Sequence, residues 1–238
     1  MISNELTIVI PSKNEGFTLE KTLWYLNKQK FIYGTNVVIA DSSDDEALKP
    51  NFPVEFYENL RIHFIKGGYP AAARRYGSVF AKRFDTRYIL FLDADMFLTD
   101  ENLLSDIIFE NYRRFDLLTV PYTTEYGYNI YYRIFDFFQW ISAKFMRQPF
   151  AIGGFQVFDT EEYWRIGGYN ADLLVGEDYE ISLKIRPSRF RVHKSRGCYT
   201  SARRLKNKGV LYMGKLMLKS WWNRKNPDYF KKHHNYWN

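Results

Sequence analysis

The stretch Tyr88-Ile-Leu-Phe-Leu-Asp-Ala-Asp-Met-Phe-Leu98 decides how the rest of the sequence is interpreted. Its first five residues are apolar or aromatic, which predicts a short strand buried on both faces of a parallel sheet. Asp93 and Asp95 follow directly, and at i and i+2 on an extended chain their side chains face the same side. Buried carboxylates need a cation or hydrogen-bond donors, and two such oxygen ligands suit a divalent ion. The alternative is a strand-end turn with two solvated aspartates.

Before this stretch, apolar segments alternate with helical segments of about 10–15 residues, which predicts βαβ units and a doubly wound, mostly parallel sheet. The predicted strands cover residues 5–11, 36–40 and 61–65, with helices after the first and third. Because the carboxyl ends of parallel strands share one edge, ligands bind there. Polar or acidic residues follow the first, second and fourth strands: Asn14 and Glu15; Asp41, Ser43 and Asp45; Asp93 and Asp95.

The second half of the chain is richer in aromatic residues and in glycine pairs. A further strand is predicted over residues 116–122, followed by an aromatic helical stretch to residue 150 that suits either a core or a helix lying on a membrane surface. Gly153-Gly154 predicts a close backbone approach before a strand. Gly176-Glu177-Asp178 opens a predicted helix whose acidic first turn is also explained by the helix dipole.

Composition predicts one globular domain, since 238 residues with 46% hydrophobic and 26% charged residues are enough for a full core. Cys198 is the single cysteine, which excludes an intramolecular disulfide and a cysteine-based zinc site and favours a reducing compartment. The sequence has no signal-peptide pattern and no run of about 18 apolar residues. We therefore expect a cytoplasmic protein, associated with the cytoplasmic face of the membrane.

Charge is distributed unevenly along the chain. Residues 184–238 contain 16 Lys and Arg against one acid, whereas residues 1–183 contain 18 against 26, so the two parts carry net charges of +15 and −8. A basic segment attached to an acidic body is expected to contact phosphates. The tryptophans among its lysines indicate an anionic membrane surface or a partner, and the sequence leaves open whether it binds membrane, substrate or a partner protein.

Four of these motifs together resemble family 2 glycosyltransferases, which have the GT-A fold. They are Ile10-Pro-Ser-Lys-Asn-Glu15, Ile39-Ala-Asp-Ser-Ser-Asp-Asp45, Ala73-Arg-Arg-Tyr-Gly77 and Asp93-Ala-Asp95. Their order and spacing agree with the family over residues 6–95. Ser42 replaces a glycine and Arg75 an asparagine that are common in the family, which leaves the choice between a UDP-sugar and a GDP-sugar open.

The resemblance implies a role for each matching residue. Asp95, with Asp93, is expected to bind Mn²⁺ or Mg²⁺. Gly176-Glu177-Asp178 resembles the Glu-Asp motif of inverting members, so Asp178 is expected to be the catalytic base, with Glu177 beside it. Arg203 and Arg204 resemble arginines that reach the donor diphosphate. The full set expected to bind the nucleotide-sugar is Pro11, Ser12, Asn14, Glu15, Asp41, Ser43, Arg74, Asp93, Ala94, Arg203 and Arg204.

The sequence thus predicts an α/β GT-A domain with a Rossmann-like sheet over residues 1–205, divided into a nucleotide-binding half (1–98) and an acceptor half (99–205). A basic, aromatic extension follows at 206–238. The expected activity is metal-dependent, inverting transfer of a sugar, of the hexosyltransferase type, to a glycan or lipid-linked hydroxyl. Two alternatives are a nucleotidyltransferase using the same acidic site and a non-enzymatic protein that binds nucleic acid or anionic membranes. Three acidic loops at one edge argue against nucleic acid as the partner.

Overall fold

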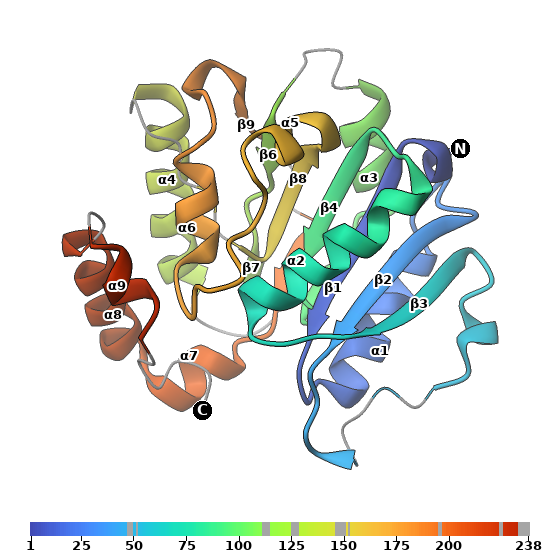
Figure 1. Ribbon diagram of the computed structural model, residues 1–238, viewed down its shortest axis with the longest axis horizontal. Coiled ribbons are helices and arrows are strands. Elements are labelled where there is room, and N and C mark those ends of the chain that lie inside the picture. Colours follow the sequence, from blue (N-terminus) through green and yellow to red (C-terminus); the bar gives the residue numbers. More distant parts are fainter. Residues whose placement is uncertain are drawn as a thin grey trace.

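The computed structural model describes residues 1–46, 50, 52–110, 115–124, 129–145, 151, 153–194, 197–223 and 226–232. Among these, seven strands form the central sheet in the order β3-β2-β1-β4-β8-β6-β9 (Figure 1). The strands are β1 (Leu6–Ser12), β2 (Thr35–Asp41), β3 (Leu60–Lys66), β4 (Tyr88–Leu92), β6 (Leu117–Thr119), β8 (Phe155–Asp159) and β9 (Phe190–Val192). Strand β8 runs antiparallel to β4 and β6, and the other pairs are parallel. The predicted α/β class and mostly parallel sheet are confirmed.

The helices pack on both faces of this sheet or extend beyond it. They are α1 (Gly16–Asn27), α2 (Pro70–Ala81), α3 (Leu103–Ser105), α4 (Asn129–Phe145), α5 (Thr160–Arg165), α6 (Glu177–Ser182), α7 (Arg203–Lys208), α8 (Val210–Trp222) and α9 (Pro227–Phe230). Short 3-10 or π-helical turns occupy Ile2–Asn4, Val54–Phe56, Lys82–Phe84, Asp106–Glu110 and Pro187–Arg189. No helix in the described part of the chain combines the length and apolarity needed to cross a bilayer.

Strand β4 is buried along its whole length, as its apolar sequence predicts. Leu90 and Leu92 belong to the core on the α1 side of the sheet, and Phe91 to the core on the other side. Burying a side chain of this size contributes about 1.5–3 kcal/mol. Helix α2 approaches the second face closely at Gly77, where an added Cβ atom would lie 2.3 Å from Val9 Cγ1. Strand β4, which leads into the loop with Asp93 and Asp95, is therefore packed on both faces.

A second, three-stranded sheet in the described residues lies beyond the carboxyl end of β4. Its order is β5-β10-β7, with β5 at Met96–Leu98, β10 at Cys198–Thr200 and β7 at Thr123–Thr124. Of the strand predicted over residues 116–122, only Leu117–Thr119 forms a strand, and β7 begins after that range. Pro121 lacks an N–H group with which to continue β6. This small sheet brings residue 201 next to the Asp95 loop.

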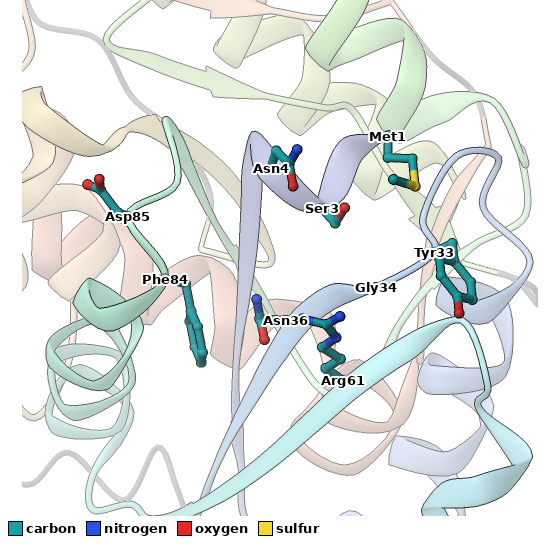
Figure 2. Close-up of a pocket in the computed structure, with 9 residues that line it drawn as sticks. All are labelled: Met1, Ser3, Asn4, Tyr33, Gly34, Asn36, Arg61, Phe84 and Asp85. Carbon is teal, nitrogen blue, oxygen red and sulfur yellow. The ribbon is translucent and has the colours of Figure 1, made fainter.

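A cavity of about 580 Å³ lies at the opposite end of the central sheet (Figure 2). Its lining comes from the amino ends of β1, β2 and β3 and from the turn before β4: Met1, Ser3, Asn4, Tyr33, Gly34, Asn36, Arg61, Phe84 and Asp85. The sequence motifs all follow the carboxyl ends of the strands. This cavity is therefore separate from the site described next.

Candidate active site

The loops that follow β1 and β2 are joined by direct hydrogen bonds. Asn14 has a left-handed backbone (φ 55°), and its amide donates to Ser43 Oγ at 2.8 Å. The Asn14 side-chain amide donates to Asp44 Oδ1 at 2.6 Å, and Ser43 Oγ donates to Asp41 Oδ1 at 2.8 Å. Three residues predicted to bind the nucleotide, Asn14, Asp41 and Ser43, therefore form one polar group at the edge of the sheet.

The loop after β4 reaches the same edge through residues that follow β10. Ser201 donates twice to Asp95, from its amide to the carbonyl at 3.2 Å and from its hydroxyl to Oδ2 at 2.7 Å. Two residues further on, the guanidinium of Arg203 pairs with Glu15 Oε1 at 2.5 Å. The structure thus brings the predicted residues Glu15, Asp95 and Arg203 together, although Arg203 is more than a hundred residues away in sequence.

Arg74 is the buried connection between the two halves of the site. Its side chain is 3% exposed, and its two terminal nitrogens contact Asp93 Oδ1 and Glu177 Oε1, each at 2.5 Å. Burial by itself would lower the pKa of the Arg74 guanidinium, but the nearby carboxylate of Asp93, together with Glu177, reverses the shift and raises it. The Arg74 guanidinium therefore stays positively charged and joins the loop after β4 to the start of α6.

Asp178 is fixed by backbone donors on both of its oxygens. Oδ2 accepts from the amide of Gly153 at 2.9 Å, and Oδ1 accepts from the amide of Tyr179 at 2.8 Å. A Cβ atom on Gly153 would lie 3.2 Å from Asp178 Cβ, so glycine permits this close approach. Burial and the neighbouring charge of Glu177 raise the pKa of Asp178 to about 6. This value suits a group that accepts a proton near neutral pH.

A divalent ion fits the donor atoms available after β4. Within the described residues there is no cluster of three or more His, Cys, Asp or Glu side chains arranged to hold a metal. Asp93 and Asp95 nevertheless present carboxylate groups from one tight loop, in which the Met96 amide donates to the Asp93 carbonyl at 3.1 Å. Mg²⁺ is commonly bound by one or two carboxylates together with substrate phosphates. The donor chemistry therefore matches a metal bound jointly with a nucleotide.

The other predicted residues lie at or near this edge with different degrees of exposure. Pro11 and Ser12 end β1, and the Ser12 hydroxyl is buried with no hydrogen-bond partner in the described part of the chain. Ala94 is buried, and its carbonyl accepts from Thr22 Oγ1 at 2.7 Å. The side chain of Arg204 lies outside the described residues.

Arg75, which replaces the asparagine common in the family, contacts a different part of the molecule. Its guanidinium donates to the carbonyl of Gly167 at 2.9 Å and lies 4.9 Å from the ring centroid of Trp164. Both partners belong to the segment around α5 and not to the set predicted to bind the donor. The substitution is therefore accommodated by packing between α2 and the turn after α5.

Sequence reasoning missed several side chains that complete the site. Ser201 holds Asp95, and the ring of Tyr169 lies 5.5 Å from the Arg74 guanidinium carbon while its hydroxyl donates to Gln156. The amide of Gly153 was also not assigned to Asp178, although the glycine pair indicated a close backbone approach. Ser201 and Tyr169 carried no comparable signal, because single polar or aromatic residues occur throughout this chain.

Comparison with known proteins agrees with this arrangement. The model of Glycosyl transferase family 2 matches residues 7–161. The chain belongs to glycosyl transferase family 2. The match includes the loops after β1, β2 and β4 but ends before Glu177, so the roles of Glu177 and Asp178 stay predictions. A search of curated proteins gave no significant match.

Solved glycosyltransferase structures share the fold of this family 2 protein. TarS 1–349 from S. aureus is 17% identical, with a TM-score of 0.60 over 84% of this chain and 61% of that one. The mannosyltransferase PcManGT from Pyrobaculum calidifontis, solved with GDP-Man and Mn²⁺, is 17% identical, with a TM-score of 0.60 over 90% and 64%. TarS has also been solved with UDP-GlcNAc. The chain spans less than two thirds of each of these proteins, and the similarity confirms the predicted GT-A fold.

Replacement of Arg74 tests the buried bridge. Arg74→Ala leaves two carboxylates in a confined space without their cation, so we expect the free energy of unfolding to fall by about 3–5 kcal/mol. Urea denaturation followed by circular dichroism measures this change. Arg165→Ala is the matched control, because its pair with Glu162 involves a guanidinium that is 60% exposed, and its midpoint is expected to change little. Equal effects of the two substitutions would contradict the bridging role.

Proposed function

We propose that this protein is a metal-dependent, inverting glycosyltransferase that moves a sugar from a UDP-sugar or GDP-sugar to an acceptor hydroxyl, with Asp178 as the base. One observation carries the proposal. Asp178 lies beside Glu177, which is joined through Arg74 to Asp93 in the loop after β4. Family membership supports a donor site at that loop, and the Arg74 bridge connects the donor site to a carboxylate suited to proton transfer.

The base acts in a single displacement. The acceptor oxygen attacks the anomeric carbon, the bond to the donor phosphate breaks, and the proton of the hydroxyl passes to Asp178. The nucleoside diphosphate departs from the opposite face, so the configuration inverts. Hydrogen bonds from Gly153 and Tyr179 hold the carboxylate in one orientation, which keeps it in line with the attacking hydroxyl.

The donor group is held at the edge formed by the first three loops. Asn14, Asp41 and Ser43 would contact the nucleoside, and Arg203 would contact the diphosphate, for which a guanidinium fork is suited by geometry and charge. Mn²⁺ or Mg²⁺ on Asp93 and Asp95 would supply positive charge that offsets the negative charge on the leaving group. Two solved relatives of the same fold contain Mn²⁺, PcManGT and GalNAc-T7.

The two alternative functions are less well supported. A nucleotidyltransferase would share the acidic edge but would not need the buried connection from Asp93 to Glu177 and Asp178. A nucleic-acid-binding protein would use the basic C-terminal part, and Arg203 in that part pairs with Glu15 at the edge of the sheet instead. Both alternatives also fit less well with membership of a glycosyltransferase family.

The ionisation of Asp178 sets the expected pH dependence. The deprotonated carboxylate is the active form, so kcat/KM should rise with pH through an acid limb near pH 6 and level off above it. Asp178→Asn should lower kcat about 10²- to 10⁴-fold while leaving donor affinity unchanged. Transfer assays over a pH series measure both effects. An acid limb at the ordinary aspartate pKa of 3.8, or an active Asn variant, would contradict the assignment.

Two acids on the same helix, Glu177 and Glu180, provide a second test of this pKa shift and its matched control. Glu177→Gln removes a charge that raises the pKa of Asp178, so the acid limb should move to lower pH. Glu180 lies on the same helix but pairs with Lys184 at 2.7 Å. Glu180→Gln is therefore expected to leave the limb in place.

We propose that this transferase contacts an anionic membrane that carries a lipid-linked acceptor. Helix α4 exposes an apolar stripe at i, i+4 and i+7 that consists of Ile130 (76% exposed), Ile134 (52%) and Phe137 (56%). An exposed apolar stripe of this kind suits the boundary between lipid head groups and acyl chains. The net charge of +15 on residues 184–238 matches anionic lipids, and this proposal places the protein at the cytoplasmic face of the membrane.

Vesicle binding tests the apolar stripe. The double substitution Ile134→Ser and Phe137→Ser should weaken binding to phosphatidylglycerol vesicles, measured by sedimentation, about tenfold or more. Two apolar side chains that would be buried among the lipids are then lost. Phe17→Ser is the control, since Phe17 is 78% exposed on α1, which Figure 1 shows on the other side of the molecule from α4. Equal binding by both variants would remove α4 from the proposed contact.

A further inference from the structure

We infer that the last described residues of the chain hold residues 173–178, which include the proposed base, in position. Phe230 is the residue that makes this contact. This inference rests on the proposed function of Asp178. The sequence predicts residues 206–238 as an extension of the catalytic domain. In the structure, however, α9 is hydrogen-bonded to the segment that precedes α6 (both labelled in Figure 1). The described end of the chain is therefore in contact with the proposed site.

The backbone of Phe230 is bonded directly to the segment that leads into the Glu177-Asp178 helix. The Phe230 carbonyl accepts from the amide of Leu174 at 2.8 Å and from the amide of Val175 at 3.3 Å. These two residues come just before Gly176, the N-cap of α6. The hydrogen bonds fix the position of the chain immediately before the two acids.

The Phe230 side chain covers Gly176 and shares a small core with a residue of helix α2. It is 7% exposed and belongs to a small core with Ala71, Leu173 and Val175. Gly176 has φ +70°, and a Cβ atom there would lie 2.8 Å from two atoms of the Phe230 ring. A glycine is thus required both by the backbone conformation and by the aromatic ring packed on it.

Ala71, a member of this small core, links it to the Arg74 bridge. Ala71 is in the first turn of α2, three residues before Arg74, whose guanidinium contacts Glu177. The small core to which Phe230 belongs therefore includes residues next to both elements that the bridge joins. Loss of Phe230 would free the start of α6 to move relative to Arg74 and Gly153, and even a displacement of about 1 Å in catalytic geometry is costly. Phe230 is a positioning residue for Asp178.

Hydrogen exchange and kinetics of Phe230→Ala test this role in the full chain. We expect exchange at residues 173–178 to become about tenfold faster, because the local opening free energy falls. We also expect kcat to fall about 10- to 100-fold with little change in donor KM. The acid limb of kcat/KM should move to lower pH, since greater access of water to Asp178 reduces the effect of burial on its pKa.

Two further variants separate positioning from general stability. Phe230→Leu keeps an apolar side chain of similar reach and should restore most of kcat and the position of the acid limb. Phe56→Ala removes an aromatic side chain that is 76% exposed in the turn Val54–Phe56 and should behave as wild type in these assays. Rescue by leucine would support the inference independently of any lower stability of the alanine variant.

Different results overturn the inference and the proposed function separately. An active wild type together with unchanged kcat and acid limb in Phe230→Ala overturns the positioning role alone. Unchanged hydrogen exchange at residues 173–178 in that variant also overturns the positioning role, because this segment is then held in place without the aromatic ring. Failure of the wild type to transfer sugar from either donor class would overturn the proposed function, and the positioning role with it, even where exchange at residues 173–178 responds as expected.

Discussion

The Arg74 ion pairs are the interaction on which the rest of the candidate site depends. A guanidinium that is 3% exposed is stable only with carboxylates in contact, and the structure places Asp93 and Glu177 at 2.5 Å from it. One carboxylate follows the central strand β4, and the other begins α6. Breaking a buried pair costs far more than an exposed one, so the bridge fixes the relative position of the donor loop and the proposed base.

The local electrostatics follow from this geometry. Two adjacent acids, Glu177 and Asp178, share a confined space with one arginine, and only Glu177 pairs with it directly. Asp178 is left with backbone donors, and burial together with its charged neighbour raises its pKa to about 6. Under the proposed function, Glu177 therefore has a structural role and Asp178 a chemical one, because their surroundings differ.

Sequence patterns predicted the strands, the mostly parallel sheet and the three loops, because each depends on local periodicity and on the rule that parallel strands end at one edge. They did not predict which groups pair across long separations. Arg74 and Glu177 are 103 residues apart, and Ser201 and Asp95 are 106 apart. The contact of Phe230 with Gly176 was missed for the same reason, and a basic composition favoured an independent extension.

We propose that the edge formed by the loops after β1, β2 and β4 binds a nucleotide together with a divalent metal. Calorimetric titration of UDP and of GDP, each with and without Mn²⁺, against the wild type and Asp95→Asn tests it most directly. We expect that one nucleotide binds tightly only with Mn²⁺ and that Asp95→Asn loses this dependence while remaining folded. Absence of binding by either nucleotide to the folded wild type, or equal metal-dependent binding by the variant, would contradict it.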